Sequence, residues 1–187
     1  MLVVRHAEAV RPRVGGPGEC DRALTAVGRG QAAALAVEIC GRRAPRRIAS
    51  SPYPRALQTV APTAERAGVP IRTHEDLREW KSGLPPTPDW RSYYERAWRE
   101  PAIPFGTGEA LEAVGGRAVA ALAEVLVCAD GDGPVVIATH GTWIARALLT
   151  YGLDVDVQFW LTMPTPAIYA LTFRGSTLTS SVGPGLK

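Results

Sequence analysis

Residues 134–141 read Pro134-Val135-Val136-Ile137-Ala138-Thr139-His140-Gly141. The continuous apolar run in this stretch is typical of a strand that is buried on both faces of a parallel sheet. A cluster of turn-forming residues at 130–133 precedes it, and a helical pattern runs from Thr142 to Tyr151 after it. A strand that leads directly into a helix is the repeating unit of α/β proteins, so we expect the rest of the chain to repeat it.

The same unit recurs on both sides of this stretch. Apolar segments of strand length occur at residues 2–5, 47–50, 71–73, 168–173 and 177–181. Helical patterns occupy about 25–40, 54–68 and 110–128, with Thr25 as the cap of the first and Pro54 at the start of the second. The 187 residues are expected to form a single domain over 1–187, a three-layer α/β/α sandwich around a mainly parallel sheet.

The segment at about 80–108 departs from this alternation, because it is rich in Pro, Trp, Tyr and Arg. Within it, the spacing of Trp90, Tyr94 and Trp98 predicts an amphipathic helix over 89–100. The aromatic face of this helix either packs on the domain below or covers a pocket. In the second interpretation the segment is an insertion that covers the substrate, with three expected substrate-binding residues, Arg91, Tyr94 and Arg99.

The composition excludes several classes of protein. Hydrophobic residues make up 46% of the chain and charged residues 21%, which is typical of a globular domain and not of a disordered or coiled-coil chain. The net charge is only +3 and is spread along the sequence, so no nucleic-acid partner is expected. No apolar run reaches the length of a membrane span, and Met1 leads directly into a strand, so we expect no membrane contact and a cytoplasmic protein.

The spacing of cysteine and histidine does not indicate a metal site. The cysteines at 20, 40 and 128 are odd in number and far apart, which predicts reduced thiols. The histidines at 6, 74 and 140 lack the spacing of zinc ligands, and His74 is expected at the surface. We therefore expect neither a metal nor another cofactor. No feature of the sequence indicates an oligomeric state.

Histidine and arginine follow the predicted strands at positions that a parallel sheet brings together. Arg5 and His6 end the first strand, His140 and Gly141 follow the strand quoted above, and Arg55 opens the helix after another strand. Ligands of α/β proteins bind at the carboxyl ends of parallel strands. Guanidinium groups match phosphate oxygens and an imidazole can attack phosphorus. The sequence therefore predicts a phosphate site at this edge of the sheet.

With this arrangement the chain resembles the histidine phosphatase superfamily, also called the phosphoglycerate-mutase-like family. The resemblance covers most of the chain and rests on motifs in the order of the family, namely Arg5-His6-Ala7-Glu8, Leu24-Thr25, Gly28, Gln31-Ala32, Ser51-Pro52, Arg55-Ala56, Gln58-Thr59, Leu77-Arg78-Glu79, Gly108-Glu109 and His140-Gly141. It implies an antiparallel strand in the sheet and a nucleophile, His6, that becomes phosphorylated. It also implies a proton donor, Glu79, and a phosphate pocket formed by Arg5, Arg55, His140 and Gly141.

The resemblance implies a phosphatase that hydrolyses a small-molecule phosphate ester. No metal is required, because Arg5, Arg55 and His140 neutralise the charge of the phosphate where other enzymes use magnesium. One alternative is a phosphomutase of the phosphoglycerate mutase type, which returns the phosphoryl group to its substrate. The other is a catalytically silent module that binds a phosphorylated ligand.

Several positions depart from the pattern of the family. Ala7 replaces the usual glycine, a small-for-small change that should leave the pocket open. Pro12 stands where many relatives carry an asparagine that helps to hold the phosphate, and proline cannot make that contact. Asp21-Arg22 resembles a branch of small phosphohistidine phosphatases that commonly lacks a donor like Glu79. The alternative acids are Glu75, Asp76 and Glu8.

Overall fold

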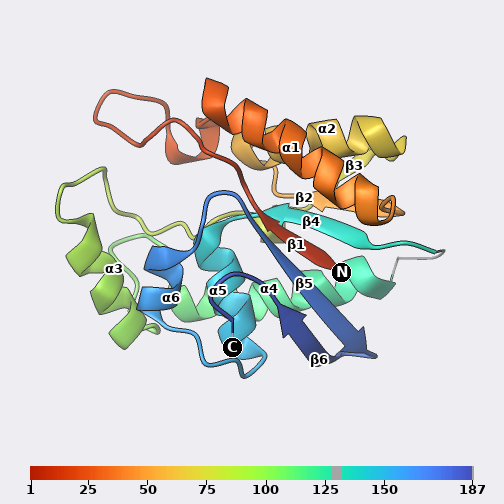
Figure 1. Ribbon diagram of the computed structural model, residues 1–187. Helices are drawn as coiled ribbons and strands as arrows, with labels where there is room; N and C mark the ends of the chain where they lie inside the picture. The colour runs from red at the N-terminus through yellow and green to blue at the C-terminus, as the bar shows by residue number, and fades with distance from the viewer. Residues whose placement is uncertain (128–131, 187) are drawn as a thin grey trace.

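The structure is a computed structural model that describes residues 1–127 and 132–186 (Figure 1). At its centre lies a six-stranded sheet in the order β3-β2-β4-β1-β5-β6. The strands are Leu2–Arg5 (β1), Arg47–Ser50 (β2), Ile71–Thr73 (β3), Val135–Thr139 (β4), Ala167–Arg174 (β5) and Thr177–Val182 (β6). The first four pair in parallel, whereas β5 pairs antiparallel with both β1 and β6. The α/β sheet is confirmed, with one strand, β5, running against the others as the resemblance implied, and with β6 running in the same direction as β1.

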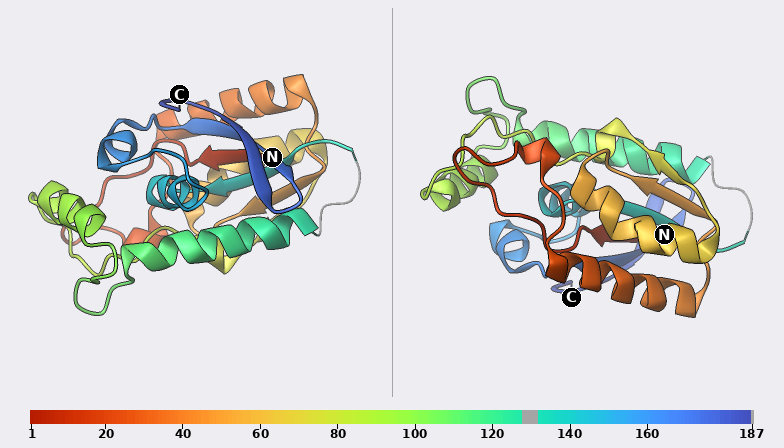
Figure 2. Two further views of the ribbon diagram at one scale, coloured as in Figure 1. Left: turned by 90° about the horizontal axis from the view of Figure 1, so that it is seen from below. Right: turned by 90° about the horizontal axis from the view of Figure 1, so that it is seen from above.

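Helices cover both faces of the sheet, as expected for a three-layer sandwich (Figures 1 and 2). On one face lie α1 (Ala26–Arg42) and α2 (Pro54–Ala67), and on the other α4 (Leu111–Val127) and α5 (Gly141–Thr150). Successive side chains of a strand point to opposite faces. Val136 therefore belongs to the core beneath α1 and α2, whereas Ile137 belongs to the core beneath α4 and α5. Burial on both faces explains why β4 is an unbroken apolar run.

One helix was not expected from the sequence. This helix is α6 (Val157–Thr162), and its cap is Asp156, whose carboxylate accepts a hydrogen bond from Phe159 N at 2.8 Å. Six residues are too few to show a helical period. By contrast, Thr25 caps α1 as expected, by accepting a hydrogen bond from Gly28 N at 3.0 Å. The remaining helices are α3 (Trp90–Arg99) and the short 3-10 turns η1 (Glu19–Asp21) and η2 (Glu75–Leu77).

Two expectations lie wholly or partly outside the described residues, namely the state of Cys128 and the turn at 130–133. The other two cysteines, Cys20 and Cys40, are free thiols. In the described part of the chain, no helix has the length and apolar character that a membrane span requires.

The segment at 80–108 leaves and rejoins the domain at adjacent points. Trp80 Nε1 donates to Glu109 O at 2.7 Å, and Glu109 N donates to Lys81 O at 2.7 Å. A Cβ at Gly83 would lie 2.6 Å from Phe105 O, so only glycine permits this approach of the two backbones. The base of the segment is therefore narrow, and its helix α3 lies beside α6 at one end of the molecule (Figures 1 and 2).

The aromatic face of α3 is divided between packing and exposure. Ala97 is buried, and Tyr94 stacks on Trp160 of α6 with ring centroids 4.6 Å apart. Trp90 remains 44% exposed, and Tyr93 38%. The packing interpretation therefore holds for Ala97 and Tyr94, whereas Trp90 and Tyr93 are only partly buried.

The close approach of α1 to the loop after β1 is testable at Gly28. A Cβ at Gly28 would overlap the Glu8 carbonyl oxygen, which belongs to the backbone and cannot rotate away. We expect Gly28→Ala to lower the free energy of unfolding by about 1–3 kcal/mol, the usual cost of overpacking. Gly30→Ala in the same helix is the control, because nothing lies within 4 Å of its added Cβ. It should raise stability by about 0.5–1 kcal/mol. Equal effects in urea denaturation would contradict the predicted clash.

Candidate active site

His6 lies directly after β1, at the carboxyl edge of the sheet. Its N–H donates to Thr139 O at 3.0 Å, which continues the pairing of β1 with β4 and places His6 beside His140. The two imidazole centroids are 5.2 Å apart. His6 Nδ1 lies 2.7 Å from Ala7 O. Because a carbonyl oxygen only accepts, we assign the ring hydrogen to Nδ1, so Nε2 is unprotonated and its lone pair can accept a hydrogen bond.

The environment of His6 keeps its ring neutral. Burial, followed by the positive charge of Arg55, lowers the pKa of His6 to about 3. A neutral imidazole with an unprotonated Nε2 is the form that a nucleophile requires.

Side chains of α1 and α2 hold the loop that follows His6. Gln31 Oε1 accepts from Glu8 N at 2.9 Å, and Thr59 Oγ1 accepts from Ala7 N at 2.9 Å. Thr59 Oγ1 in turn donates to the backbone oxygen of Arg55 at 2.6 Å. These motif residues therefore position the backbone of the site. Ala7 belongs to a small buried cluster, so the methyl group that replaces glycine packs in the core.

Arg55 is the buried cation of the site. It lies in the first turn of α2, and its side chain has no exposed surface. Nε donates to His6 Nε2 at 3.3 Å, Nη1 to Glu19 O at 2.5 Å, and Nη2 to the Glu19 carboxylate at 2.7 Å. Arg22 holds the same carboxylate with Nη2 at 2.6 Å and Nε at 2.8 Å. The Glu19 carboxylate thus lies between two guanidinium groups beside the imidazole.

Arg5 is anchored by the loop that leads to β5. Its Nη1 donates to Met163 O and, at 3.3 Å, to Pro164 O. A Cβ at Gly141 would lie 3.2 Å from Arg5 Cζ and 3.3 Å from Trp160 Nε1, so glycine at the start of α5 leaves room for both groups. Arg5 Nε is buried without a hydrogen-bond partner among the described residues. This N–H is therefore available to an anion.

His140 is fully buried at the end of β4. Burial lowers its pKa well below the usual value, and the charge of Arg55 adds to this effect. Its Nε2 lies 2.8 Å from Ser51 Oγ, which itself accepts from Tyr53 N at 3.3 Å. Ser51 can therefore donate to Nε2, which leaves the hydrogen of the neutral ring on Nδ1. Within the described part of the chain Nδ1 has no partner, so His140 offers a hydrogen bond to an anion and no positive charge.

Glu79 combines burial with backbone contacts to its carboxylate. Oε1 accepts from Trp80 N at 2.9 Å, and Oε2 lies 3.4 Å from Thr142 N at the start of α5. Burial raises the pKa of Glu79, which favours the protonated form that an acid must have. Burial lowers the pKa of Arg5, and the charge of Glu79 opposes this change, so the carboxylate acts on the same pocket.

Arg117 of α4 fixes the backbone around Glu79. Its Nη1 donates to Asp76 O at 2.8 Å and to Arg78 O at 2.7 Å, and its Nη2 donates to Glu79 O at 3.2 Å. The same guanidinium binds the Glu109 carboxylate through Nε at 2.7 Å and Nη2 at 3.0 Å. Burial opposes the ionisation of Glu109, but the hydrogen bond and charge of Arg117 prevail and lower its pKa. Arg117 therefore positions Glu79 from outside the segment at 80–108.

The alternative acids are placed differently from Glu79. Glu75 is exposed, and the Asp76 side chain is 46% exposed and pairs with Arg78 at 3.4 Å. Glu8 is exposed and accepts from Thr25 Oγ1 at 2.6 Å.

His74 is only partly a surface residue, because its side chain is 19% exposed. It accepts from Asp76 N at 3.2 Å and lies 3.1 Å from Glu124. The expectation for His74 therefore holds only in part.

The expected substrate-binding residues of α3 do not lie together. Tyr94 stacks on Trp160, the residue that lies against Gly141 near Arg5. Arg91 is exposed and pairs with Glu95 at 3.1 Å, and Arg99 is exposed. The structure therefore connects Tyr94, but not the two arginines, with the phosphate pocket.

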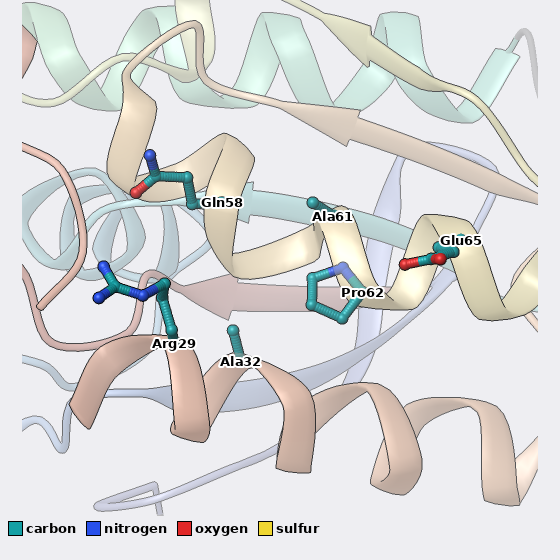
Figure 3. Close-up of a pocket in the computed structure, with 6 residues that line it drawn as sticks. All are labelled: Arg29, Ala32, Gln58, Ala61, Pro62 and Glu65. Carbon is teal, nitrogen blue, oxygen red and sulfur yellow. The ribbon is translucent and has the colours of Figure 1, made fainter. Parts of the chain in front are cut away.

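A separate cleft of about 300 Å³ lies between α1 and α2 (Figure 3). Its lining consists of Arg29, Ala32, Gln58, Ala61, Pro62 and Glu65. None of the residues expected to bind or transfer phosphate lines it. We therefore place the candidate site at the edge of the sheet and not in this cleft.

Four residues of the site were not expected from the sequence, namely Glu19, Arg22, Arg117 and Trp160. Only Arg22 carried a signal, as part of a motif of one branch of the family. The other three are brought to the site by tertiary contacts.

Comparisons with known proteins agree with this site. Glucosyl-3-phosphoglycerate phosphatase of Mycobacterium tuberculosis (strain CDC 1551 / Oshkosh) is 34% identical, over 86% of this chain and 78% of that protein. The enzyme of the same name from Mycolicibacterium vanbaalenii is 33% identical, over 76% of this chain and 68% of that protein. A solved structure of a mycobacterial glucosyl-3-phosphoglycerate phosphatase is 28% identical, with a TM-score of 0.71 over 98% of this chain and 96% of that one.

More distant structures share the fold. Phosphoserine phosphatase of Entamoeba histolytica in complex with 3-phosphoglyceric acid is 22% identical, with a TM-score of 0.74 over 96% of this chain and 94% of that one. The expected fold and the expected class of enzyme, a phosphomonoesterase, are confirmed by these relatives together with the family match. That match spans residues 1–181, and the chain belongs to the histidine phosphatase superfamily (branch 1).

Proposed function

We propose that this phosphatase transfers the phosphoryl group of a small-molecule ester to His6 Nε2 and then to water. The observation that carries the proposal is the state of His6, whose Nδ1 is bound to Ala7 O and whose Nε2 faces Arg55 at 3.3 Å. With a pKa of about 3, the ring is neutral at physiological pH. An uncharged Nε2 beside a fixed cation suits attack on a phosphate.

In the first step, Nε2 attacks phosphorus as the bond from phosphorus to the ester oxygen breaks. Arg5 and Arg55 bind the equatorial oxygens, on which the charge of the transition state is spread. His140 adds a neutral hydrogen bond through Nδ1. Glu79, in its protonated form, donates its proton to the departing oxygen and becomes a carboxylate. The products are phosphohistidine and the alcohol.

In the second step, the Glu79 carboxylate removes a proton from water, which attacks phosphorus from the side opposite Nε2. The bond from phosphorus to nitrogen breaks, phosphate leaves, and Glu79 is again protonated. Arg5 and Arg55 supply the positive charge in both steps, so the proposal includes no divalent metal. In this proposal His140 contributes a hydrogen bond and not the charge neutralisation that was expected from the sequence, because burial lowers the pKa of His140 and disfavours its charged form.

The substrate proposal rests on the aromatic wall, a name used here for Trp160, Tyr94 and Trp90. Tyr94 stacks on Trp160, and Trp90 contacts both rings at centroid distances of 5.9 and 6.1 Å. Aromatic faces bind the apolar side of a ring while its polar groups remain in water. We propose a phosphorylated sugar or glycerate derivative, with glucosyl-3-phosphoglycerate as the first candidate because two relatives carry that name.

Three further points belong to this proposal. Arg91 and Arg99 are proposed to bind the acidic part of the substrate, and the segment at 80–108 is proposed to cover it.

A phosphomutase remains the alternative, although the relatives' names favour hydrolysis. We also propose a cytoplasmic location, which suits the free thiols of Cys20 and Cys40.

The nucleophile is tested by trapping the intermediate. Rapid quenching with labelled substrate, in excess chelator, should give an acid-labile, base-stable phosphoenzyme with the label on His6. His6→Ala should lose turnover and stay folded, because the ring lies at the edge of the sheet. His74→Gln is the matched control and should keep both turnover and label. A label on another residue, or a requirement for a divalent cation, would contradict the mechanism.

Glu79→Gln tests the acid through the leaving group. Alkyl phosphates need a protonated leaving oxygen, whereas p-nitrophenolate leaves unaided, so kcat for the alkyl ester should fall by about 10²- to 10⁴-fold and much less for the aryl ester. Phosphoenzyme should accumulate with the aryl ester, because Glu79 also activates water. Glu75→Gln, in the exposed turn η2, is the control and should change neither rate. Equal losses on both esters without accumulation would show that Glu79 only positions other groups.

The aromatic wall is tested by comparing a large substrate with a small one. We expect Trp160→Leu and Tyr94→Leu to lower kcat/KM for glucosyl-3-phosphoglycerate more than for p-nitrophenyl phosphate, because they remove contacts remote from phosphorus. Arg91→Ala and Arg99→Ala, measured in the same way, test the proposed role of the arginines. A uniform loss on both substrates with a lower melting temperature would show that the wall only packs.

A further inference from the structure

The Glu19 carboxylate occupies N–H groups that a phosphate would use. Arg55 Nη2 binds it at 2.7 Å, Arg22 Nη2 at 2.6 Å, and Arg22 Nε at 2.8 Å. The remaining Arg55 nitrogen on this side, Nε, faces His6 Nε2 at 3.3 Å. A carboxylate and a phosphate present oxygen atoms to a guanidinium fork in the same way. An anion held here therefore competes for the donors beside the nucleophile.

The two sides of this contact differ in their freedom to move. The Arg55 side chain has no exposed surface, and the Arg22 side chain is 12% exposed and also donates to Val10 O at 2.8 Å. The Glu19 side chain is 47% exposed and belongs to the three-residue turn η1. The carboxylate can therefore rotate into water, whereas the arginines stay in place.

A backbone contact keeps the turn in position without the carboxylate. Arg55 Nη1 donates to Glu19 O at 2.5 Å, and Asp21 N donates to Gly18 O at 3.0 Å. Departure of the side chain thus leaves the loop beside the pocket. It frees three N–H groups, two on Arg22 and one on Arg55, at the edge of the site.

We propose that Glu19 is an internal competitor for the phosphate site, and that Arg22 becomes a phosphate ligand when the substrate displaces it. This inference rests on the proposed function, because it requires phosphate to bind beside His6 and Arg55. Arg22 supplies a contact to phosphate in a loop where Pro12 provides no side-chain donor. An enzyme of this design binds phosphate less tightly than its arginines allow, since part of the binding free energy displaces Glu19. It therefore releases the product, inorganic phosphate, more readily.

The test is the affinity for inorganic phosphate, measured by calorimetry on the full chain. Glu19→Gln keeps the shape and removes the charge, and we expect it to lower the Kd for phosphate by about ten-fold, as for a competitor that occupies about nine-tenths of the molecules. Asp21→Asn is the matched control, because it removes the same charge from an exposed residue of the same turn. It should leave the Kd within about two-fold, the effect of general charge at an exposed position. Glu19→Ala and the melting temperatures show whether the turn stays folded.

The double variant Glu19→Gln/Arg22→Gln separates the two parts of the proposal. If Arg22 binds phosphate, this variant should lose the gain in affinity of Glu19→Gln. An unchanged Kd in both Glu19→Gln and Glu19→Ala, in protein that forms the His6 phosphoenzyme, would overturn the internal competitor and leave the proposed function intact. An equal gain in Asp21→Asn would also overturn it, because general charge would then explain the effect. Absence of both phosphate binding and phosphoenzyme in every variant would overturn the two proposals together.

Discussion

Parallel pairing of β1 with β4 and of β4 with β2 is the constraint on which the site depends. The register sets Arg5 opposite Thr139, and Ser50 opposite Ala138, so the three strands end at the same edge of the sheet. The residues after these ends are therefore neighbours by backbone geometry alone. The His6 and His140 rings, and the turn that leads to Arg55, meet without any long loop to bring them together.

Burying the polar groups of this pocket is unfavourable, and this free energy is already spent when the protein folds, before phosphate binds. Arg55 and His140 have no exposed surface, and Arg5 Nε and His140 Nδ1 find no partner among the described residues. An unpaired buried donor is unfavourable in the free protein, because it has lost its hydrogen bond to water. An arriving phosphate regains that free energy by accepting these hydrogen bonds. The donors are also fixed before the reaction, so they need little rearrangement in the transition state.

The sequence identified those parts of the site that follow a regular element. Arg5, His6 and His140 could be placed because they end or follow strands with clear apolar runs, and Arg55 because it opens the helix after the short strand Arg47–Ser50. Glu79 could be identified from a motif of the family, but the contacts that position it could not. Arg117 binds backbone carbonyl oxygens, and because every residue has one, no residue type in the sequence indicates this contact. Glu19 and Trp160 reach the pocket from a loop and from a helix of six residues, where no period indicates the direction of a side chain.

The narrow base of the segment at 80–108 makes the structure of the segment independent of the contacts that hold Glu79. The backbones at Gly83 and Phe105 are already in contact, so the ends of the segment meet whatever lies between them. Doubling the length of a closed loop costs only about 0.6 kcal/mol. Arg117 and Thr142 hold Glu79 from α4 and α5, outside the segment. Exchange of α3 and its flanks as one part would therefore leave the residues at the edge of the sheet in place, so design can vary the segment without rebuilding the proposed phosphate pocket.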